Sequence, residues 1–236
     1  MKLCFFLTSH GRSENYEWQA LAYKKFKYIK NFDIIIHDNS NISKETLTAA
    51  TKNLVNIKCI LSNEPNHGYY LGQLNAINNY YYLLKEYDYV IHHVHDFFFL
   101  DDSYLRDWLE NFQEYPGVGF LTNQFPFHPS NNKFVTQATL CLASDCFIFD
   151  PKIANDFFWK KTLSYGNIPP ELILYKATQE LNIPVIFWPR LHKTKSGRTL
   201  FAPKPQDLEN LHKNFYPDTI GTMHNHNYDI LKLYLE

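Results

Sequence analysis

The sequence predicts an α/β fold in which a mixed, mainly parallel sheet is flanked by helices. In its first half, short apolar runs alternate with amphipathic segments of helical period, the pattern of consecutive strand–helix units. The run Lys2–Thr8 (KLCFFLT) is almost continuously apolar, as expected of a strand that helices cover on both faces. The length of 236 residues, 45% of them hydrophobic, suits one domain with a small C-terminal addition.

Apolar spacing predicts the first helix, Tyr16–Ile29. Its apolar residues fall on one helical face: Trp18, Leu21, Ala22, Phe26 and Ile29. Phe32–His37 (FDIIIH) is predicted as the second strand, and the polar stretch Asp38–Ser43 follows it. Ser43 is expected to cap a helix that runs to Leu54, because a serine side chain accepts a hydrogen bond from the first unpaired N–H groups.

The next two strand–helix units are predicted in the same way. The third and fourth strands are expected at Ile57–Leu61 and Tyr89–Val94, and helices at Tyr70–Glu86 and Ser103–Tyr115. The last of these helices has its apolar residues on one face: Leu105, Trp108, Leu109 and Phe112. We therefore expect a core on both sides of the sheet.

The pattern changes after Pro116. Strands are predicted at Gly119–Thr122, Ala138–Phe149 and Pro184–Trp188, and a helix at Glu171–Leu181 that Pro169 and Pro170 open. We expect residues 1–190 to form one domain with halves 1–115 and 116–190. Residues 191–236 are expected to pack on it as a short, mainly helical extension, with a basic loop and helices at Gln206–Phe215 and Tyr228–Leu235.

Composition narrows the function classes. The 23 basic and 24 acidic residues give a net charge of −1, which disfavours a general nucleic-acid binder. The four cysteines lie in apolar runs without a C-x-x-C pair and are expected to be buried thiols: Cys4, Cys59, Cys141 and Cys146. The apolar core Leu3–Leu7 is too short for a signal peptide, and no run approaches the roughly 20 apolar residues of a membrane span. A cytoplasmic protein is expected.

The segment Asp88–Asp102 (DYVIHHVHDFFFLDD) is the strongest candidate site. Imidazole and carboxylate side chains at this spacing can bind a divalent ion, with His93 and His95 on one face of the strand and Asp96 on the other. For His92 and His93 we favour burial in the core with backbone partners. For Asp96 we favour a functional role, because burying a carboxylate in so apolar a run is costly without a cation or strong donors.

Polar residues follow the ends of several predicted strands. Ligands of open α/β sheets bind outside the carboxyl ends of the strands, so these polar stretches should converge: His10–Arg12, Asp38–Asn41, Asn63–Gly68 and His95–Asp96. The segment Asn66–Asn78 (NHGYYLGQLNAIN) adds an Asn- and Gly-rich start to a helix, whose N–H groups suit a polar or anionic ligand.

These motifs, in this order, resemble the nucleotide-sugar-binding half of family 2-like GT-A glycosyltransferases. The resemblance covers Lys2–Phe112 and, more loosely, the chain to Pro189: T-S-H-G-R, D-N-S, N-x-G-x-x-x-G-Q-x-x-A-I-N and a strand that ends in Asp before F-x-L-D-D. It implies that Asp38 holds the nucleobase or ribose of a nucleotide diphosphate sugar. It also implies that Thr8, His10 and Arg12 line the nucleotide pocket, and that the ribose and sugar lie near Asn66, Gly68 and Gln73.

One motif departs from the family pattern. The D-x-D triplet that carries a metal ion in these enzymes is Val94-His95-Asp96 here, so its first acid is missing. Either Asp96 holds Mn²⁺ or Mg²⁺ with histidines such as His95 and His224, or cations take the metal's place. The segment Arg190–Arg198 (RLHKTKSGR) offers Lys193, Lys195 and Arg198 for the phosphates, and the alternative for it is a solvated surface loop. For His224 the alternative is an exposed polar histidine.

The resemblance also implies a general base at the start of a helix after the acceptor-side strands. Glu171 matches that place, and its alternative role is to complement the helix dipole. Asp145 is the second catalytic candidate. The expected function is transfer of a monosaccharide from a nucleotide diphosphate sugar to a glycan acceptor, with inversion. The alternatives are a metal-dependent hydrolase that uses His93, His95 and Asp96, and a non-catalytic nucleotide-sugar-binding protein.

Overall fold

A computed structural model describes most of the chain. The described residues are 1–10, 14–24, 26–27, 31–39, 42–62, 68–99, 102–126, 140–188, 192–193, 199–200 and 222–224. Only the backbone is described for residues 59–62, 68–70, 123–126, 140–141, 143, 187–188, 192–193, 199–200 and 222–224. The predicted helices Gln206–Phe215 and Tyr228–Leu235 lie outside these residues.

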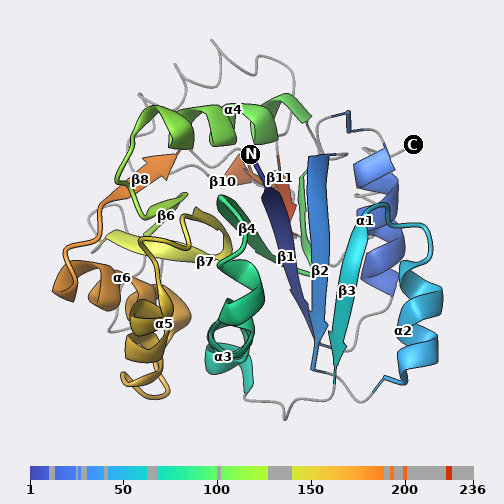
Figure 1. The fold of residues 1–236 in the computed structure, drawn as a ribbon, viewed down its shortest axis with the longest axis horizontal. Coiled ribbons are helices and arrows are strands. Elements are labelled where there is room, and N and C mark those ends of the chain that lie inside the picture. Colours follow the sequence, from blue (N-terminus) through green and yellow to red (C-terminus); the bar gives the residue numbers. More distant parts are fainter. Residues whose placement is uncertain are drawn as a thin grey trace.

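A sheet of seven strands forms the centre of the protein (Figure 1). Its strands, in spatial order, are β3 (Ile57–Ser62), β2 (Phe32–Asp38), β1 (Leu3–Ser9), β4 (Tyr89–Val94), β7 (Leu140–Phe149), β6 (Phe120–Pro126) and β8 (Val185–Trp188). The pairs β1–β2, β2–β3, β1–β4 and β6–β8 are parallel, whereas β7 is antiparallel to both β4 and β6. Six strands therefore point one way and only β7 opposes them, so the predicted mixed, mainly parallel sheet is confirmed.

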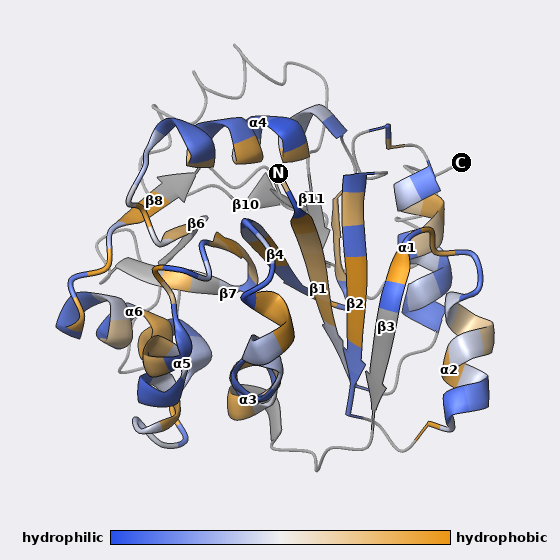
Figure 2. Cartoon of the chain, in the orientation of Figure 1, coloured by the Kyte–Doolittle hydropathy of each residue, from blue (hydrophilic) through white to orange (hydrophobic). Residues whose placement is uncertain are grey.

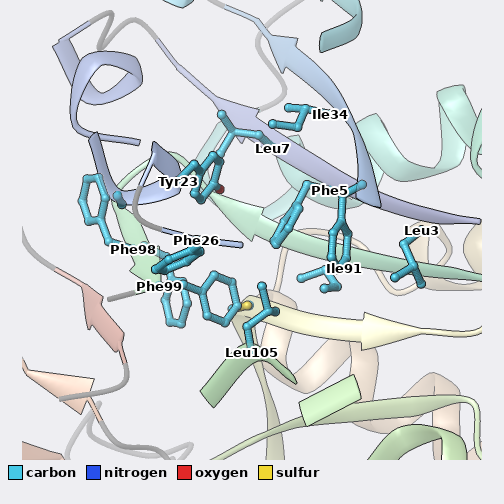
Figure 3. Close-up of a cluster of buried hydrophobic side chains, with 14 of the residues drawn as sticks. Leu3, Phe5, Leu7, Tyr23, Phe26, Ile34, Ile91, Phe98, Phe99 and Leu105 are labelled. Atoms are coloured by element: carbon cyan, nitrogen blue, oxygen red, sulfur yellow. The ribbon is translucent and has the colours of Figure 1, made fainter. Parts of the chain in front are cut away.

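Helices cover both faces of this sheet. They are α1 (Glu14–Lys24), α2 (Lys44–Thr51), α3 (Gly68–Leu84), α4 (Asp102–Glu114), α5 (Asp156–Leu163) and α6 (Pro170–Glu180). Successive residues of β1 point to opposite faces: Phe5 packs in a core with α1, α2 and α4, and Phe6 in a second core with α3, α5 and α6. β1 and the middle of β2 are correspondingly apolar in Figure 2, and Figure 3 shows part of the first core around Phe5 and Phe99.

A second, smaller sheet brings late residues back to the centre of the chain. It contains β5 (Phe97–Phe99), β9 (His192–Lys193), β10 (Thr199–Leu200) and β11 (Thr222–His224), in the order β10-β9-β11-β5. None of these strands was predicted. Lys193, in the predicted basic segment Arg190–Arg198, pairs with Thr199 just after that segment, so short antiparallel strands flank residues 194–198.

Several local predictions are confirmed. The four apolar residues predicted for one face of α4 are all buried: Leu105, Trp108, Leu109 and Phe112. Ser43 caps α2, because its Oγ accepts a hydrogen bond from the Thr46 N–H at 3.2 Å. Cys4 and Cys146 are buried thiols outside any disulfide. None of the described helices has the length and apolar content that a bilayer span requires.

The first helix differs from its prediction. α1 ends at Lys24 instead of Ile29, and Leu21, predicted on its inward face, is 43% exposed. The buried residues of α1 are Asn15, Tyr16, Gln19, Ala20, Ala22 and Tyr23. Leu21 is the misplaced residue, because Ala22 and Phe26 are buried as predicted. The buried face of α1 also carries polar side chains, which meet the ends of strands. Helix α5 was also not predicted. It begins after Asn155, whose Oδ1 accepts a hydrogen bond from the Phe158 N–H at 3.2 Å.

Two glycines offer a matched test of packing. A Cβ at Gly119, just before β6, would lie 2.3 Å from Cγ2 of Ile183 and 3.0 Å from Cγ2 of Ile153, closer than atoms can pack. We expect Gly119→Ala to lower the free energy of unfolding by about 1–3 kcal/mol. Among the residues that the structure describes, a Cβ at Gly72 in α3 would meet only Nδ2 of Asn39, at 3.6 Å. Gly72→Ala should leave stability unchanged or raise it by up to about 1 kcal/mol. Urea unfolding of both variants measures this, and equal effects would contradict the packing at Gly119.

Candidate active site

Three strand ends meet at one edge of the large sheet. Ser9 of β1 pairs with Asp38 of β2, and Thr8 pairs with Val94 of β4. The pairing continues beyond β4, since the His95 N–H donates to the Thr8 carbonyl at 2.9 Å. The polar residues that follow β1, β2 and β4 are thus neighbours, as the strand-end rule predicts.

Asp38 is the most enclosed carboxylate at this edge, with 1% of its surface exposed. The hydroxyl of Tyr16, on α1, donates a hydrogen bond to Asp38 Oδ2 at 2.7 Å. Burial, and secondly the Asp38 charge, raise the pKa of Tyr16 far above its ordinary value. Tyr16 therefore stays a hydrogen-bond donor at every physiological pH.

A second polar pair lies beside Asp38. His10 Nδ1 donates to Asn39 Oδ1 at 2.8 Å, which joins the residues that follow β1 and β2. Helix α3 approaches the same place, because Gly72 lies close to the Asn39 amide. Gln73, next along α3, is partly buried. The residues that are predicted to bind the nucleoside and sugar, where the structure describes them, lie at the ends of β1 and β2 and on α3.

The turn after β4 carries Asp96, which is 7% exposed. Gln19 of α1 fixes this turn through its Nε2, which donates to the His95 carbonyl at 3.2 Å and to the Phe97 carbonyl at 2.7 Å. Phe97 pairs in turn with His224 of β11. The predicted late histidine thus has its backbone opposite the residue that follows Asp96.

His92 and His93 are core residues, as favoured from the sequence. His92 Nε2 lies 3.0 Å from Thr8 Oγ1, and its ring packs against Phe147 with centroids 4.6 Å apart. His93 Nδ1 donates to the Val94 carbonyl at 3.2 Å, and its Nε2 accepts from the Tyr23 hydroxyl at 2.7 Å. Burial lowers the pKa of His92 to about 3 and that of His93 to about 4. Both nitrogens of His93 are engaged inside the protein, which argues against the hydrolase that needs His93 as a ligand.

Two further carboxylates reach the same edge from the second half of the chain. Cys146 of β7 pairs with His93, so Asp145 lies beside the end of β4, where its charge raises the pKa of His92 against the effect of burial. Glu171 lies in the first turn of α6 and accepts a hydrogen bond from Ser144 Oγ at 2.5 Å. Both candidate catalytic acids therefore lie at this edge on the β7 side of β4, whereas Asp38 lies on the other side of β4, at the end of β2.

The remaining candidates are only partly described. Arg12, Asn66, Lys195 and Arg198 lie outside the described residues, and Gly68, Lys193 and His224 are described by their backbone alone. Among the side chains that the structure describes, no three of His, Cys, Asp or Glu gather as a metal-ligand set.

Sequence reasoning missed three residues of this edge: Tyr16, Gln19 and Ser144. Tyr16, Gln19 and Tyr23 follow one another at helical spacing, so a polar stripe on α1 was the available signal. The function of this polar stripe depends on which strand ends it faces, and the sequence alone does not determine those neighbours.

Comparison with known proteins identifies the fold. No protein family matches the sequence, and no curated protein does. The solved structure of galactosyltransferase LgtC with donor and acceptor sugar analogues is similar, with TM-score 0.62 and 11% identity over 99% of this chain and 95% of that one. Mouse xyloside xylosyltransferase 1 has TM-score 0.55 and 9% identity over 97% and 99%. Mannosyltransferase PcManGT from Pyrobaculum calidifontis, in complex with GDP-Man and Mn²⁺, has TM-score 0.53 and 9% identity over 79% and 54%.

The chain therefore has the GT-A fold of nucleotide-diphospho-sugar transferases. A 4-diphosphocytidyl-2C-methyl-D-erythritol synthase and a CMP-sugar-acid synthetase share the fold as well, so it is common to glycosyltransferases and nucleotidyltransferases. At these low identities the likeness concerns the fold, and the chemistry has to be argued from the site.

The buried His92 should make stability depend on pH. Its pKa is about 3 in the folded protein against 6.5 ordinarily, so as the pH falls below about 6.5 the unfolded chain gains a proton that the folded protein does not. Stability linked to His92 is complete above about pH 6.5 and is lost as the pH falls towards about 3. We expect His92→Gln, which keeps a polar partner for Thr8, to gain about 2 kcal/mol relative to wild type between about pH 7.5 and about pH 5.

Chemical denaturation at the two pH values measures this difference. The exposed His10 offers the control, because His10→Gln should track the wild type. A parallel loss in wild type and His92→Gln would contradict a neutral, buried His92.

Proposed function

We propose that this protein transfers a monosaccharide from a nucleotide diphosphate sugar to a glycan acceptor, with inversion at the anomeric carbon. The observation that carries the proposal is the gathering of Asp38, Asp96 and Glu171 at one edge of a GT-A sheet. Ordinary folding does not require three carboxylates at this edge, and burial makes two of them costly.

The donor would lie over β1, β2 and α3. Asp38 would accept a hydrogen bond from the nucleobase or ribose, and its fixed carboxylate supports that role. His10 and Thr8 would line the same pocket, together with Arg12. The start of α3, with Asn66, Gly68 and Gln73, would face the ribose and sugar.

The diphosphate would lie at the turn of Asp96. A divalent cation, when bound, neutralises charge on a leaving nucleoside diphosphate. Asp96 would offer Mn²⁺ or Mg²⁺ the carboxylate that such ions prefer, and the backbone register sets His224 opposite Phe97, the residue after Asp96. His95 is the second imidazole of this turn. Lys193, Lys195 and Arg198 would contribute positive charge to the phosphates from the segment around β9 and β10.

Glu171 would act as the general base. Its carboxylate takes the proton of the acceptor hydroxyl while that oxygen forms a bond to the anomeric carbon. The bond from the anomeric carbon to the phosphate oxygen breaks, and the nucleoside diphosphate leaves with the electron pair. The hydrogen bond from Ser144 orients the carboxylate. Asp145 would bind an acceptor hydroxyl, or serve as base in place of Glu171.

Exchanging Glu171 tests this assignment. Glu171→Gln keeps the shape and the Ser144 contact but cannot take a proton, so we expect turnover to fall by about 10²–10⁴-fold with nucleotide affinity unchanged. Glu180→Gln is the control at the far end of the same helix, where Glu180 pairs with Lys161 on the surface. Activity is measured as release of nucleoside diphosphate from a panel of nucleotide sugars with sugar acceptors.

The products decide between the functions. Unchanged turnover in Glu171→Gln removes Glu171 as base, and retention of the anomeric configuration, read by NMR, removes the single displacement. Release of pyrophosphate from a nucleoside triphosphate would instead identify a nucleotidyltransferase. Nucleotide-sugar binding without turnover would identify a binding protein.

Asp96 allows a separate test of metal use. We expect Mn²⁺ to tighten nucleoside diphosphate binding by about ten-fold in calorimetry, equivalent to about 1.4 kcal/mol, and Asp96→Asn to abolish that gain. Asp102→Asn, at the start of α4, serves as a control because Asp102 accepts a hydrogen bond from the Lys27 N–H outside the site. An equal Mn²⁺ effect in wild type and Asp96→Asn would show that Asp96 is not a ligand.

A further inference from the structure

Helix α1 turns a polar face towards the sheet. Asn15, Tyr16, Gln19 and Tyr23 carry polar groups among its buried side chains, beside Ala20 and Ala22, while the apolar Leu21 points outward. A helix on the face of a sheet is normally stabilised by burying an apolar stripe. The polar groups on the buried face of α1 therefore call for a reason other than burial of apolar surface.

Two of these side chains contact the elements that carry the site's aspartates. The Tyr16 hydroxyl donates to Asp38 Oδ2 at 2.7 Å, and Gln19 Nε2 donates to the carbonyls on both sides of Asp96, those of His95 and Phe97. Tyr16 and Gln19 are three residues apart, so they lie on one face of α1. A single helix therefore holds the carboxylate of Asp38 and the backbone turn that carries Asp96.

The arrangement is costly for stability. Gln19 is fully buried, and its Oε1 has no hydrogen-bond partner among the described residues. A buried acceptor without a partner costs about 1–3 kcal/mol, and an apolar side chain of similar size would avoid that cost. The bonds from Gln19 to the two carbonyls fix the turn of Asp96, which an apolar residue could not do.

We propose that Tyr16 and Gln19 are positioning residues for the donor: Tyr16 orients Asp38 towards the nucleoside, and Gln19 sets the turn of Asp96 for the diphosphate. This inference rests on the proposed function. Tyr16 would act on binding of the nucleoside, and Gln19, three residues further along the same helix, would act on binding of the diphosphate. Each position should therefore affect a different part of the ligand.

The test measures binding of nucleoside monophosphates and diphosphates by calorimetry. The probes are the mono- and diphosphate of whichever base the wild type binds best, with Mn²⁺ present. We expect Tyr16→Phe to weaken both ligands by about ten-fold, because both contain the nucleoside. We expect Gln19→Met to leave the monophosphate within about two-fold and to remove most of the gain from mono- to diphosphate.

Tyr23→Phe is the matched control. Tyr23, labelled in Figure 3, is on the same helix and equally buried, but its hydroxyl bonds to His93 inside the core. This variant should lose stability as Tyr16→Phe does, yet bind both ligands within about two-fold of wild type. Urea unfolding of all three variants separates a loss of folding from a loss of affinity.

The outcomes separate the two ideas. If the wild type binds nucleotides but Tyr16→Phe and Gln19→Met bind both ligands as Tyr23→Phe does, the positioning roles are wrong and the proposed function stands. If both variants weaken both ligands equally, α1 supports the site as a whole and the division between Tyr16 and Gln19 is wrong. If the wild type binds no nucleotide of any base, the proposed function fails and this inference with it.

Discussion

The candidate site depends on the parallel pairing of β1 with β2 on one side and β4 on the other. This pairing continues to the last residues of the strands, with Ser9 opposite Asp38 and Thr8 opposite Val94. Parallel strands end at the same edge, so the first polar residue after each strand is delivered to one place. A shift of one residue between β1 and β2 would turn Asp38 to the other face of the sheet, and a shift between β1 and β4 would displace the turn of Asp96. The register is held by packing, because successive side chains of β1 fill a different core on each side of the sheet.

Much of this arrangement follows from the sequence, because buried parallel strands are continuous apolar runs and their polar ends are easy to recognise. α4 was equally clear, since Leu105, Trp108 and Leu109 repeat at helical spacing. The burial of Tyr16 and Gln19 on α1 could not be predicted from apolar spacing, because these side chains form hydrogen bonds to residues at the strand ends. The strands β9, β10 and β11 are two or three residues long, and β11 pairs with β5 and β9 far earlier in the chain, so no local pattern marks them.

The segment Asp88–Asp102 shows how neighbouring residues of one type divide between structure and site. His92 and His93 belong to β4, where alternate side chains enter the two cores, and burial keeps both neutral. Asp96 lies beyond the strand, in a turn whose carbonyls α1 holds. The end of β4 at Val94 therefore separates core histidines from the candidate site. The sequence suggested this division through the cost of burying a carboxylate, but it could not locate the turn.

The acceptor side is built by a different principle from the donor side. β7 runs against β4, so its beginning rather than its end reaches the site edge, and it continues past the end of β4 while still paired with β6. Ser144 and Asp145 lie on this extension, and Ser144 contacts Glu171 at the start of α6. The rule of carboxyl strand ends could not select these residues, because it applies to strands that point towards the ligand. Because β7 is antiparallel, the residues at its beginning reach the same edge as the ends of β1, β2 and β4. They lie on the other side of the end of β4 from Asp38.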